Sequence, residues 1–308
     1  MQFLTWPLIV LGLAVFEIIS SADNAIINAE VLSTMSAKGR RWFLLWGILF
    51  AVFVVRGFLP LLIVWLTLPE FGFLGALTAT FSSDPAVHRA IEGSAPVLLM
   101  SGGIFLVFLF LHWLFLEQKE YGMIGERFFY GKGLWFYAVA SVILCLVVWF
   151  SLRIGSMLAF GGVIGSTLFF ITSGFKANAE RTEKSLMQSS LTDLSKILYL
   201  EVIDSTFSID GVLGAFAFTL AVPLILVGNG IGAVVVRQLT VGNIENIRRL
   251  RYLKKGAMYS ILFLGIIMLV DAFGFEVPSW ASPLLTFVTV GYFFVKSLRF
   301  LKRQTPPR

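Results

Sequence analysis

The sequence predicts an all-α polytopic membrane protein with about nine transmembrane helices and an inverted-topology internal repeat. Three observations support this fold class. Hydrophobic residues make up 57% of the 308 residues and charged residues only 14%, whereas a soluble domain is about one quarter charged. The apolar residues form runs long enough to cross a bilayer, which requires roughly 20 residues. A polar motif within the first apolar run recurs within the sixth.

Nine apolar runs, separated by charged or turn-rich breaks, are candidates for membrane-spanning helices. They lie near residues 6–28, 42–66, 94–116, 134–151, 154–175, 195–220, 222–242, 257–275 and 280–298. Only SLRIG separates the fourth run from the fifth, and only the turn around Pro223 separates the sixth from the seventh, so each pair forms a hairpin. The segment 67–93 has an apolar, glycine-containing centre. The sequence leaves open whether this segment is re-entrant, interfacial or solvated.

The basic residues predict the orientation of these helices. With nine spans, twenty of the 24 Lys and Arg residues fall on one side of the membrane, and only Arg89 and Arg153 fall on the other. Because Lys and Arg are enriched in cytoplasmic segments, we expect a multi-pass protein of the cytoplasmic (inner) membrane, with the N-terminus outside and the C-terminus cytoplasmic. This bias accounts for the net charge of +6 without a nucleic-acid partner. The expected partners are the lipid bilayer and a metal ion, and a homodimer is left open.

The sixth run repeats a polar motif of the first. The segment EIISSADNAIIN (17–28) aligns with DSTFSIDGVLGA (204–215). This alignment pairs two acids and one serine of each segment: Glu17 with Asp204, Ser21 with Ser208, and Asp23 with Asp210. Downstream, GILFAVFVVR (47–56) aligns with GNGIGAVVVR (228–237), and both end in arginine. Because the first helix runs inward and the sixth outward, the units form an inverted repeat, as in many transporters with a midplane site.

The repeat divides one transmembrane transporter domain, residues 1–308, into three parts. Repeat one covers about 6–116, the connecting helices cover about 134–175, and repeat two covers about 195–298. The site is then expected between the first and sixth helices, where the two acidic motifs would face each other.

Acidic side chains inside membrane helices indicate an ion site. Each carboxylate at a helix centre costs about 2.5–3.5 kcal/mol on insertion scales, so four of them rarely serve packing alone. In a regular helix the two acids of each copy point about 120° apart, so we expect the helix to loosen near the serines. An alternative is that Glu17 and Asp204 form only buried ion pairs with Arg56 and Arg237. That arrangement would leave the second acid of each copy without a cation.

The candidate ligands of this site all carry oxygen donors. Such a shell suits Mn²⁺, Mg²⁺ or Ca²⁺ rather than Zn²⁺ or Cu⁺. The expected metal ligands are Glu17, Asp23, Asn24, Asp204 and Asp210, with Ser20, Ser21 and Ser208 as supporting ligands; Arg56 and Arg237 would balance the charge, and Glu201 and Asp271 are candidates for a proton relay or vestibule. We expect no permanently bound cofactor and no enzymatic activity, because the cation is the substrate.

The two motifs resemble those of the TerC family of bacterial integral membrane proteins, within the wider group of LysE-type transporters. The resemblance rests on Glu17–Ser21–Asp23–Asn24, on Asp204–Phe207–Asp210, and on the runs that end at Arg56 and Arg237. It implies export of manganese or another divalent metal, with some relatives linked to tellurite resistance. Gly211 stands where many relatives have a polar residue. With the long 67–93 segment, this departure indicates a divergent branch.

These observations favour a carrier that exports a divalent cation, above all manganese, with proton coupling left open. The rival interpretation is a non-transporting scaffold or tellurite-type stress-resistance protein with a structural ion site. A channel lined by the same acids is a further alternative, and an intramembrane hydrolase with paired aspartates is more remote.

Overall fold

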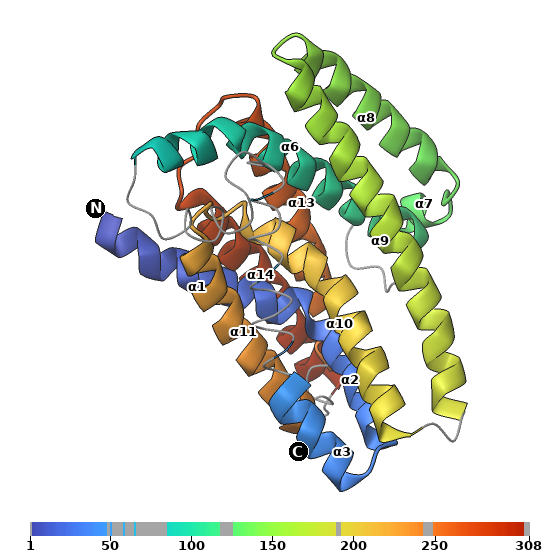
Figure 1. Ribbon diagram of the computed structural model, residues 1–308. Coiled ribbons are helices and arrows are strands. Elements are labelled where there is room, and N and C mark those ends of the chain that lie inside the picture. The colour runs from blue at the N-terminus through green and yellow to red at the C-terminus, as the bar shows by residue number, and fades with distance from the viewer. Residues whose placement is uncertain are drawn as a thin grey trace.

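The computed structural model describes residues 2–47, 85–117, 126–188, 192–242 and 249–304, with the single positions 50, 58 and 65. All regular structure in these residues is helical (Figure 1). The helices are α1 (Gln2–Ser20), α2 (Ala22–Ser33), α3 (Ala37–Trp42), the π-helical turn η1 (Phe43–Gly47), α6 (Pro85–Leu116), α7 (Glu126–Tyr130), α8 (Trp135–Leu152), α9 (Ser156–Gln188), α10 (Asp193–Ala215), α11 (Val222–Gly242), α13 (Leu253–Ala272) and α14 (Ala281–Gln304).

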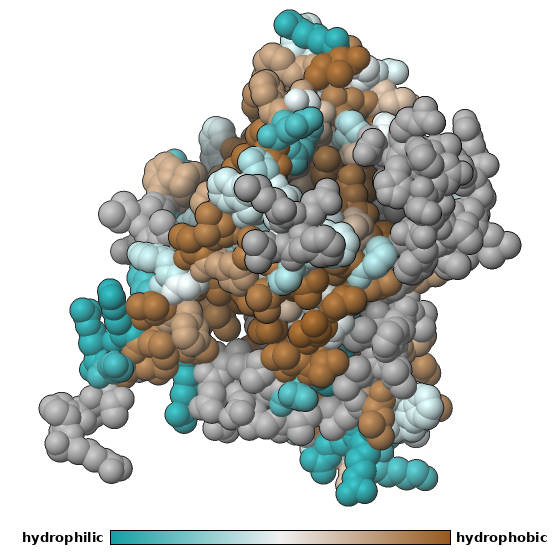
Figure 2. Space-filling model, turned by 90° about the vertical axis from the view of Figure 1, so that its left-hand side faces the viewer, coloured by the Kyte–Doolittle hydropathy of each residue, from teal (hydrophilic) through white to brown (hydrophobic). Residues whose placement is uncertain are grey.

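Several of these helices are long and apolar enough to cross a membrane. Five such segments occur in the described residues: Gly93–Leu116, Trp135–Leu152, Ser156–Asn178, Leu253–Ala272 and Ala281–Arg303. Two shorter apolar helices, Thr5–Ser20 and Val222–Gln238, accompany them. Figure 2 shows hydrophobic side chains over the middle of one face, with the most hydrophilic side chains toward its upper and lower ends. The protein is therefore an all-α membrane protein.

The described helices overlap eight of the nine predicted spans, although the first span is divided between α1 and α2. The run predicted at 222–242 is α11, and the run predicted at 134–151 is α8 to within one residue at each end. Most of the predicted span 42–66 and residues 67–84 lie outside the described residues. The remainder of the uncertain 67–93 segment is helical from Pro85 onward, as the beginning of α6. The count of nine and the inverted repeat remain predictions.

Helix α6 forms the centre of the largest packed core. It packs against α13 on one side and α9 on another, while α8 covers α9 and α14 covers α13 (Figure 1). Its Phe105 and Phe108 meet the ring of Phe169 on α9 edge to face, with centroids 6.0 and 5.7 Å apart. Most of the α6 span is buried, whereas α8 is largely exposed. An apolar helix exposed in this way is suited to contact lipid.

Small residues allow α9 to approach α6 closely. A Cβ atom at Gly161 would lie 2.8 Å from the Val97 carbonyl oxygen, and one at Gly165 would overlap the Ser101 carbonyl. The Ser101 hydroxyl donates a hydrogen bond of 2.8 Å to the Gly161 carbonyl. Close backbone approach at glycine with a serine hydrogen bond is typical of helix packing in membranes.

The first turn of α10 holds the corner between α2 and α3. The Lys196 ammonium donates to the Thr34 hydroxyl at 2.9 Å and to the Thr34 carbonyl at 3.3 Å, where α2 ends. The Asp193 carboxylate accepts from the Ser36 hydroxyl and, at 3.3 Å, from the Ser36 backbone N–H. A cation at the C-terminus of a helix also complements the helix dipole. This corner fixes how α2 and α10 lie beside each other below the acidic motifs.

Candidate functional site

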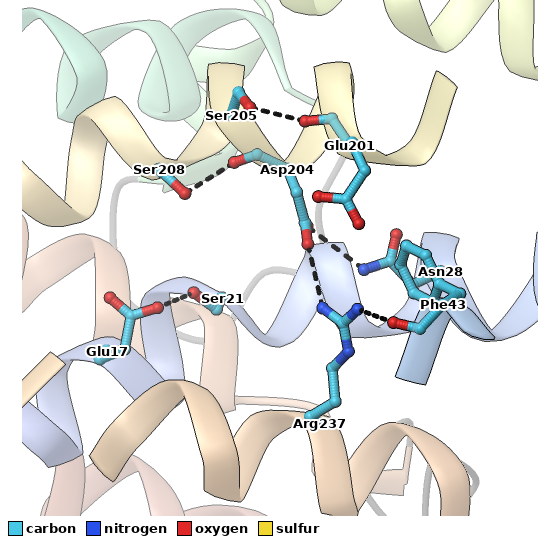
Figure 3. A network of polar contacts seen from close by, with 9 residues as sticks. All are labelled: Glu17, Ser21, Asn28, Phe43, Glu201, Asp204, Ser205, Ser208 and Arg237. Atoms are coloured by element: carbon cyan, nitrogen blue, oxygen red, sulfur yellow. Dashed lines mark hydrogen bonds and ion pairs between the residues drawn. The ribbon is translucent and has the colours of Figure 1, made fainter. Parts of the chain in front are cut away.

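The first acidic motif lies where the chain passes from α1 to α2. Glu17 is only 1% exposed, and the Ser21 hydroxyl donates to its Oε1 atom at 2.5 Å (Figure 3). Ser21 has φ −89° and ψ 2°, and the helix is interrupted there between Ser20 and Ala22. The predicted loosening near the serines is therefore found in the first motif.

Glycines of α10 and α11 make room for the Glu17 side chain. A Cβ at Gly232 on α11 would lie 2.5 Å from the Cβ of Glu17, and one at Gly211 on α10 would lie 3.0 Å from Glu17 Oε2. Gly228, one turn before Gly232, has the same relation to the Cβ of Leu13, again at 2.5 Å. The stem of Glu17 thus lies against α11 and its carboxylate lies against α10, where a side chain at position 211 would crowd it.

The second acidic motif places Asp204 in a buried polar network (Figure 3). The Asn28 amide on α2 donates to Asp204 Oδ1 at 3.2 Å, and Arg237 Nη1 on α11 lies 3.5 Å from Asp204 Oδ2. Arg237 Nη2 donates to the Phe43 carbonyl at 2.7 Å, and the guanidinium lies 4.1 Å from the centroid of the Phe43 ring. Asp204 and Arg237 are only 6% and 8% exposed, so this ion pair is shielded from solvent.

Glu201 lies one turn before Asp204 on the same side of α10. It is 8% exposed, and neither of its carboxylate oxygens has a hydrogen-bond partner among the described residues. A Cβ at Gly47 would overlap both Glu201 Oε1 and Arg237 Nη2, so the Glu201 carboxylate lies beside the guanidinium (Figure 3). A buried carboxylate without donors is costly. Glu201 therefore has the capacity to accept a proton or to coordinate a cation.

Asp210 faces a different neighbour from Asp204. Its carboxylate forms an ion pair with Lys176 on α9, and the two side chains are 13% and 15% exposed. Helix α10 continues without interruption through both motif serines, so the predicted loosening of the second motif is wrong. The hydroxyls of Ser205 and Ser208 instead bond back to the carbonyls of Glu201 and Asp204, at 2.6 and 2.7 Å. In an unbroken helix, residues six apart diverge by about 120°.

The other predicted site residues divide into two groups. Asp23 and Asn24 belong to α2, but their side chains, like Arg56, lie outside the described residues. Ser20 bonds to the Glu17 carbonyl at 3.3 Å, and Asp271 Oδ1 accepts the Val277 backbone N–H at 2.6 Å. Asp271 therefore stabilises the turn between α13 and α14. Within the described residues, no three His, Cys, Asp or Glu side chains are grouped to hold a metal ion.

Three polar residues near these motifs were not predicted as part of the site. Asn28 shares a helix face with Glu17 eleven residues earlier, and this spacing was the available signal. The predicted topology places Lys176 in a cytoplasmic segment after the run 154–175, but α9 continues past that run and carries this lysine. Asn229 lies within the aligned GNGIGAVVVR segment and is 1% exposed, and its amide atoms have no hydrogen-bond partner in the described part of the chain.

Comparison with known proteins identifies a family but not an activity. A family model named DUF475, described as a protein of unknown function, matches residues 22–304. No curated protein and no solved structure matches the chain. Because the matched region covers almost all of the 308 residues, the chain belongs to the DUF475 family.

Proposed function

We propose that this membrane protein is a transporter that exports a divalent metal cation, with manganese as the favoured substrate and calcium or magnesium as the alternatives. The observation that carries the proposal is the presence of buried carboxylates on helices that pack together, two of them (Glu201 and Asp204) beside Arg237. Glu17, Glu201 and Asp204 are each at most 8% exposed, and they lie on helices that meet inside the bundle. Ionisable residues inside membrane proteins commonly mark ion pathways.

The chemistry of the side chains supports a hard divalent cation. Carboxylate, amide and hydroxyl oxygens suit Mn²⁺, Mg²⁺ and Ca²⁺. The resemblance of both motifs to the TerC family adds the preference for manganese. In our proposal Glu17, Asp23, Asn24, Asp204 and Asp210 bind the cation, Ser20, Ser21 and Ser208 support them, and Arg56 and Arg237 balance the charge between transport steps.

Transport in this proposal follows from the inverted repeat. One repeat rocks against the other, with the N-terminus outside and the C-terminus in the cytoplasm, so that the site opens to each side in turn. Glu201 supports proton coupling, because a buried carboxylate with no donor among the described residues can exchange a proton for a cation.

A second candidate function is a membrane scaffold or tellurite-type resistance protein in which the charges are structural. The contacts of the second motif favour this alternative. Asp204 has Arg237 and Asn28 as partners, and Asp210 has Lys176, so both acids have protein partners without any bound cation. Substituting the acids would then alter stability but would have no transport to abolish.

Flux of radioactive manganese into proteoliposomes separates the two functions. We expect saturable uptake with the unmodified protein and a fall to background with Asp23→Asn/Asp210→Asn and with Asp204→Asn. Glu276→Gln is the matched control, because it removes an exposed carboxylate beyond α13 and should leave the flux unchanged. If no variant or wild-type protein moves manganese, calcium or magnesium under an imposed pH gradient, the carrier proposal fails.

A further inference from the structure

Lys176 connects the acidic motif to a part of the protein outside both repeats. It lies on α9, which the sequence assigns to the connecting helices, and its ammonium contacts Asp210 Oδ2 on α10. The second oxygen, Asp210 Oδ1, is buried and has no hydrogen-bond partner among the described residues. Asp210 therefore has one oxygen held by a lysine and one oxygen open to a further donor or cation.

A lysine ammonium and a metal cation both bind to the negatively charged carboxylate of Asp210. A lysine ammonium is a compact, strongly hydrated charge on a flexible stem, so it can leave a carboxylate more readily than an arginine fork can. A divalent cation that coordinates Asp210 would repel the adjacent positive charge. Binding of Lys176 and binding of the cation at this carboxylate are thus in competition.

The packing of α9 allows the lysine to move while the helix stays attached. The close approach to α6 occurs at Gly161 and Gly165. Lys176 is eleven residues beyond Gly165, which is roughly 16 Å along a helix. Release of the ammonium from Asp210 leaves that anchor intact and removes the Lys176–Asp210 contact between α9 and α10.

We propose that Lys176 is a tethered cation that occupies Asp210 in the empty protein and is displaced by the transported metal. The inference rests on the proposed function and deepens it. The lysine stabilises the carboxylate between transport steps, so the empty site keeps its charge balanced. Its displacement breaks the polar contact between α9 and α10 and thereby signals occupancy to the α8–α9 hairpin.

The test is direct manganese binding to the full chain in detergent, followed by the electron paramagnetic resonance signal of free Mn²⁺. A cation can bind only those molecules in which the competitor has left. We therefore expect Lys176→Gln to lower the apparent dissociation constant about tenfold, within the roughly 5- to 150-fold range usual for coupling between two ligands. Lys176→Arg should raise the apparent dissociation constant, because a guanidinium can bind a carboxylate through two parallel hydrogen bonds.

Two controls make the outcomes distinct. In an Asp210→Asn background the Lys176 substitutions should have no effect on binding, because a double-mutant cycle isolates the pair. Size-exclusion profiles identify any variant that fails to fold, and Lys176→Arg then still tests the proposal. Wild-type binding with affinity unchanged or weakened in Lys176→Gln, or unchanged in Lys176→Arg, overturns the tethered cation alone. Absence of Mn²⁺, Ca²⁺ and Mg²⁺ binding in every variant overturns the proposed function together with this inference.

Discussion

Individual glycines determine where the carboxylate of Glu17 can lie. Gly211 and Gly232 come from different helices, yet a Cβ at either one would crowd the Glu17 side chain. In the sequence, Gly211 is only a departure from the pattern of a similar family. The structure shows that it faces the Glu17 carboxylate. The sequence could not predict this contact, because a single sequence does not specify which helices touch.

Arg237 illustrates which part of a polar site can be predicted. Its position inside an apolar run predicted an acidic partner, and Asp204 is that partner. Its contact with the Phe43 carbonyl was not predictable, because a backbone acceptor leaves no trace in residue identity. That carbonyl belongs to the π-helical turn η1, and such turns are frequent at functional sites.

Asp193 makes the stability of the α2–α3 corner depend on pH. The hydrogen bonds from the Ser36 hydroxyl and backbone N–H hold the pKa of the Asp193 carboxyl below its ordinary value of 3.8. Because the folded pKa is the lower one, the stabilisation is complete above the unfolded value and is lost as the pH falls through the folded value. We expect the thermal unfolding midpoint of wild type to decline more steeply on acidification than that of Ser36→Ala, measured in detergent between about pH 3 and 6. Parallel curves for the two proteins would show that the contact has no energetic role.

At the scale of the element, the two aligned motifs differ in helical structure although both contain serines. The α1–α2 path is interrupted at Ser21, whose hydroxyl bonds to a carboxylate, whereas α10 is continuous and its serines bond to carbonyls one turn earlier. A serine hydroxyl in a helix can donate either to a nearby side chain or to the backbone carbonyl one turn earlier. The alignment predicted that both helices loosen near their serines, but only the first one does. Which acceptor a serine hydroxyl bonds to depends on its neighbours in the fold, and the alignment does not give these.

The attachment of α9 to α6 can be tested at one glycine. Gly165→Ala places a Cβ into the Ser101 carbonyl, and we expect a loss of roughly 1–3 kcal/mol of stability from overpacking. Gly174→Ala is the matched control on the same helix, since no atom lies within 4 Å of a Cβ there. Alanine also favours helix over glycine, so the control should be as stable as wild type or slightly more so. Thermal unfolding in detergent compares them, and equal losses in both variants would contradict the packing described for α6 and α9.

At the scale of the whole molecule, hydropathy predicted most of the long helices that the structure describes. Apolar runs located the described helices to within a few residues at most ends, because a bilayer span fixes both length and composition. The runs did not predict that α9 continues beyond residue 175 to Gln188. They also could not predict which side chains contact Asp204 and Asp210, because hydropathy does not specify which helix faces meet.

The basic residues predict the orientation of the molecule, and this prediction is open to direct measurement. Cys145 is exposed on α8, so it is first replaced by serine. In that background we expect Ser279→Cys, between α13 and α14, to react with a membrane-impermeant maleimide in intact cells. Lys132→Cys, between α7 and α8, should react only after permeabilisation, because the cytoplasmic side carries the basic residues. The reverse labelling pattern would invert the topology.

The corner where Lys196 and Asp193 hold Thr34 and Ser36 has a mechanical consequence. It ties α2, from the predicted first repeat, to α10, from the predicted second repeat, at the end predicted to be cytoplasmic. In a rocking carrier, a fastening at one end closes the gate on that side and leaves the opposite gate as the one that can swing. If the protein is the carrier proposed above, the structure would correspond to the outward-facing half of the cycle, and the interruption at Ser21 would be the place where the first motif could bend.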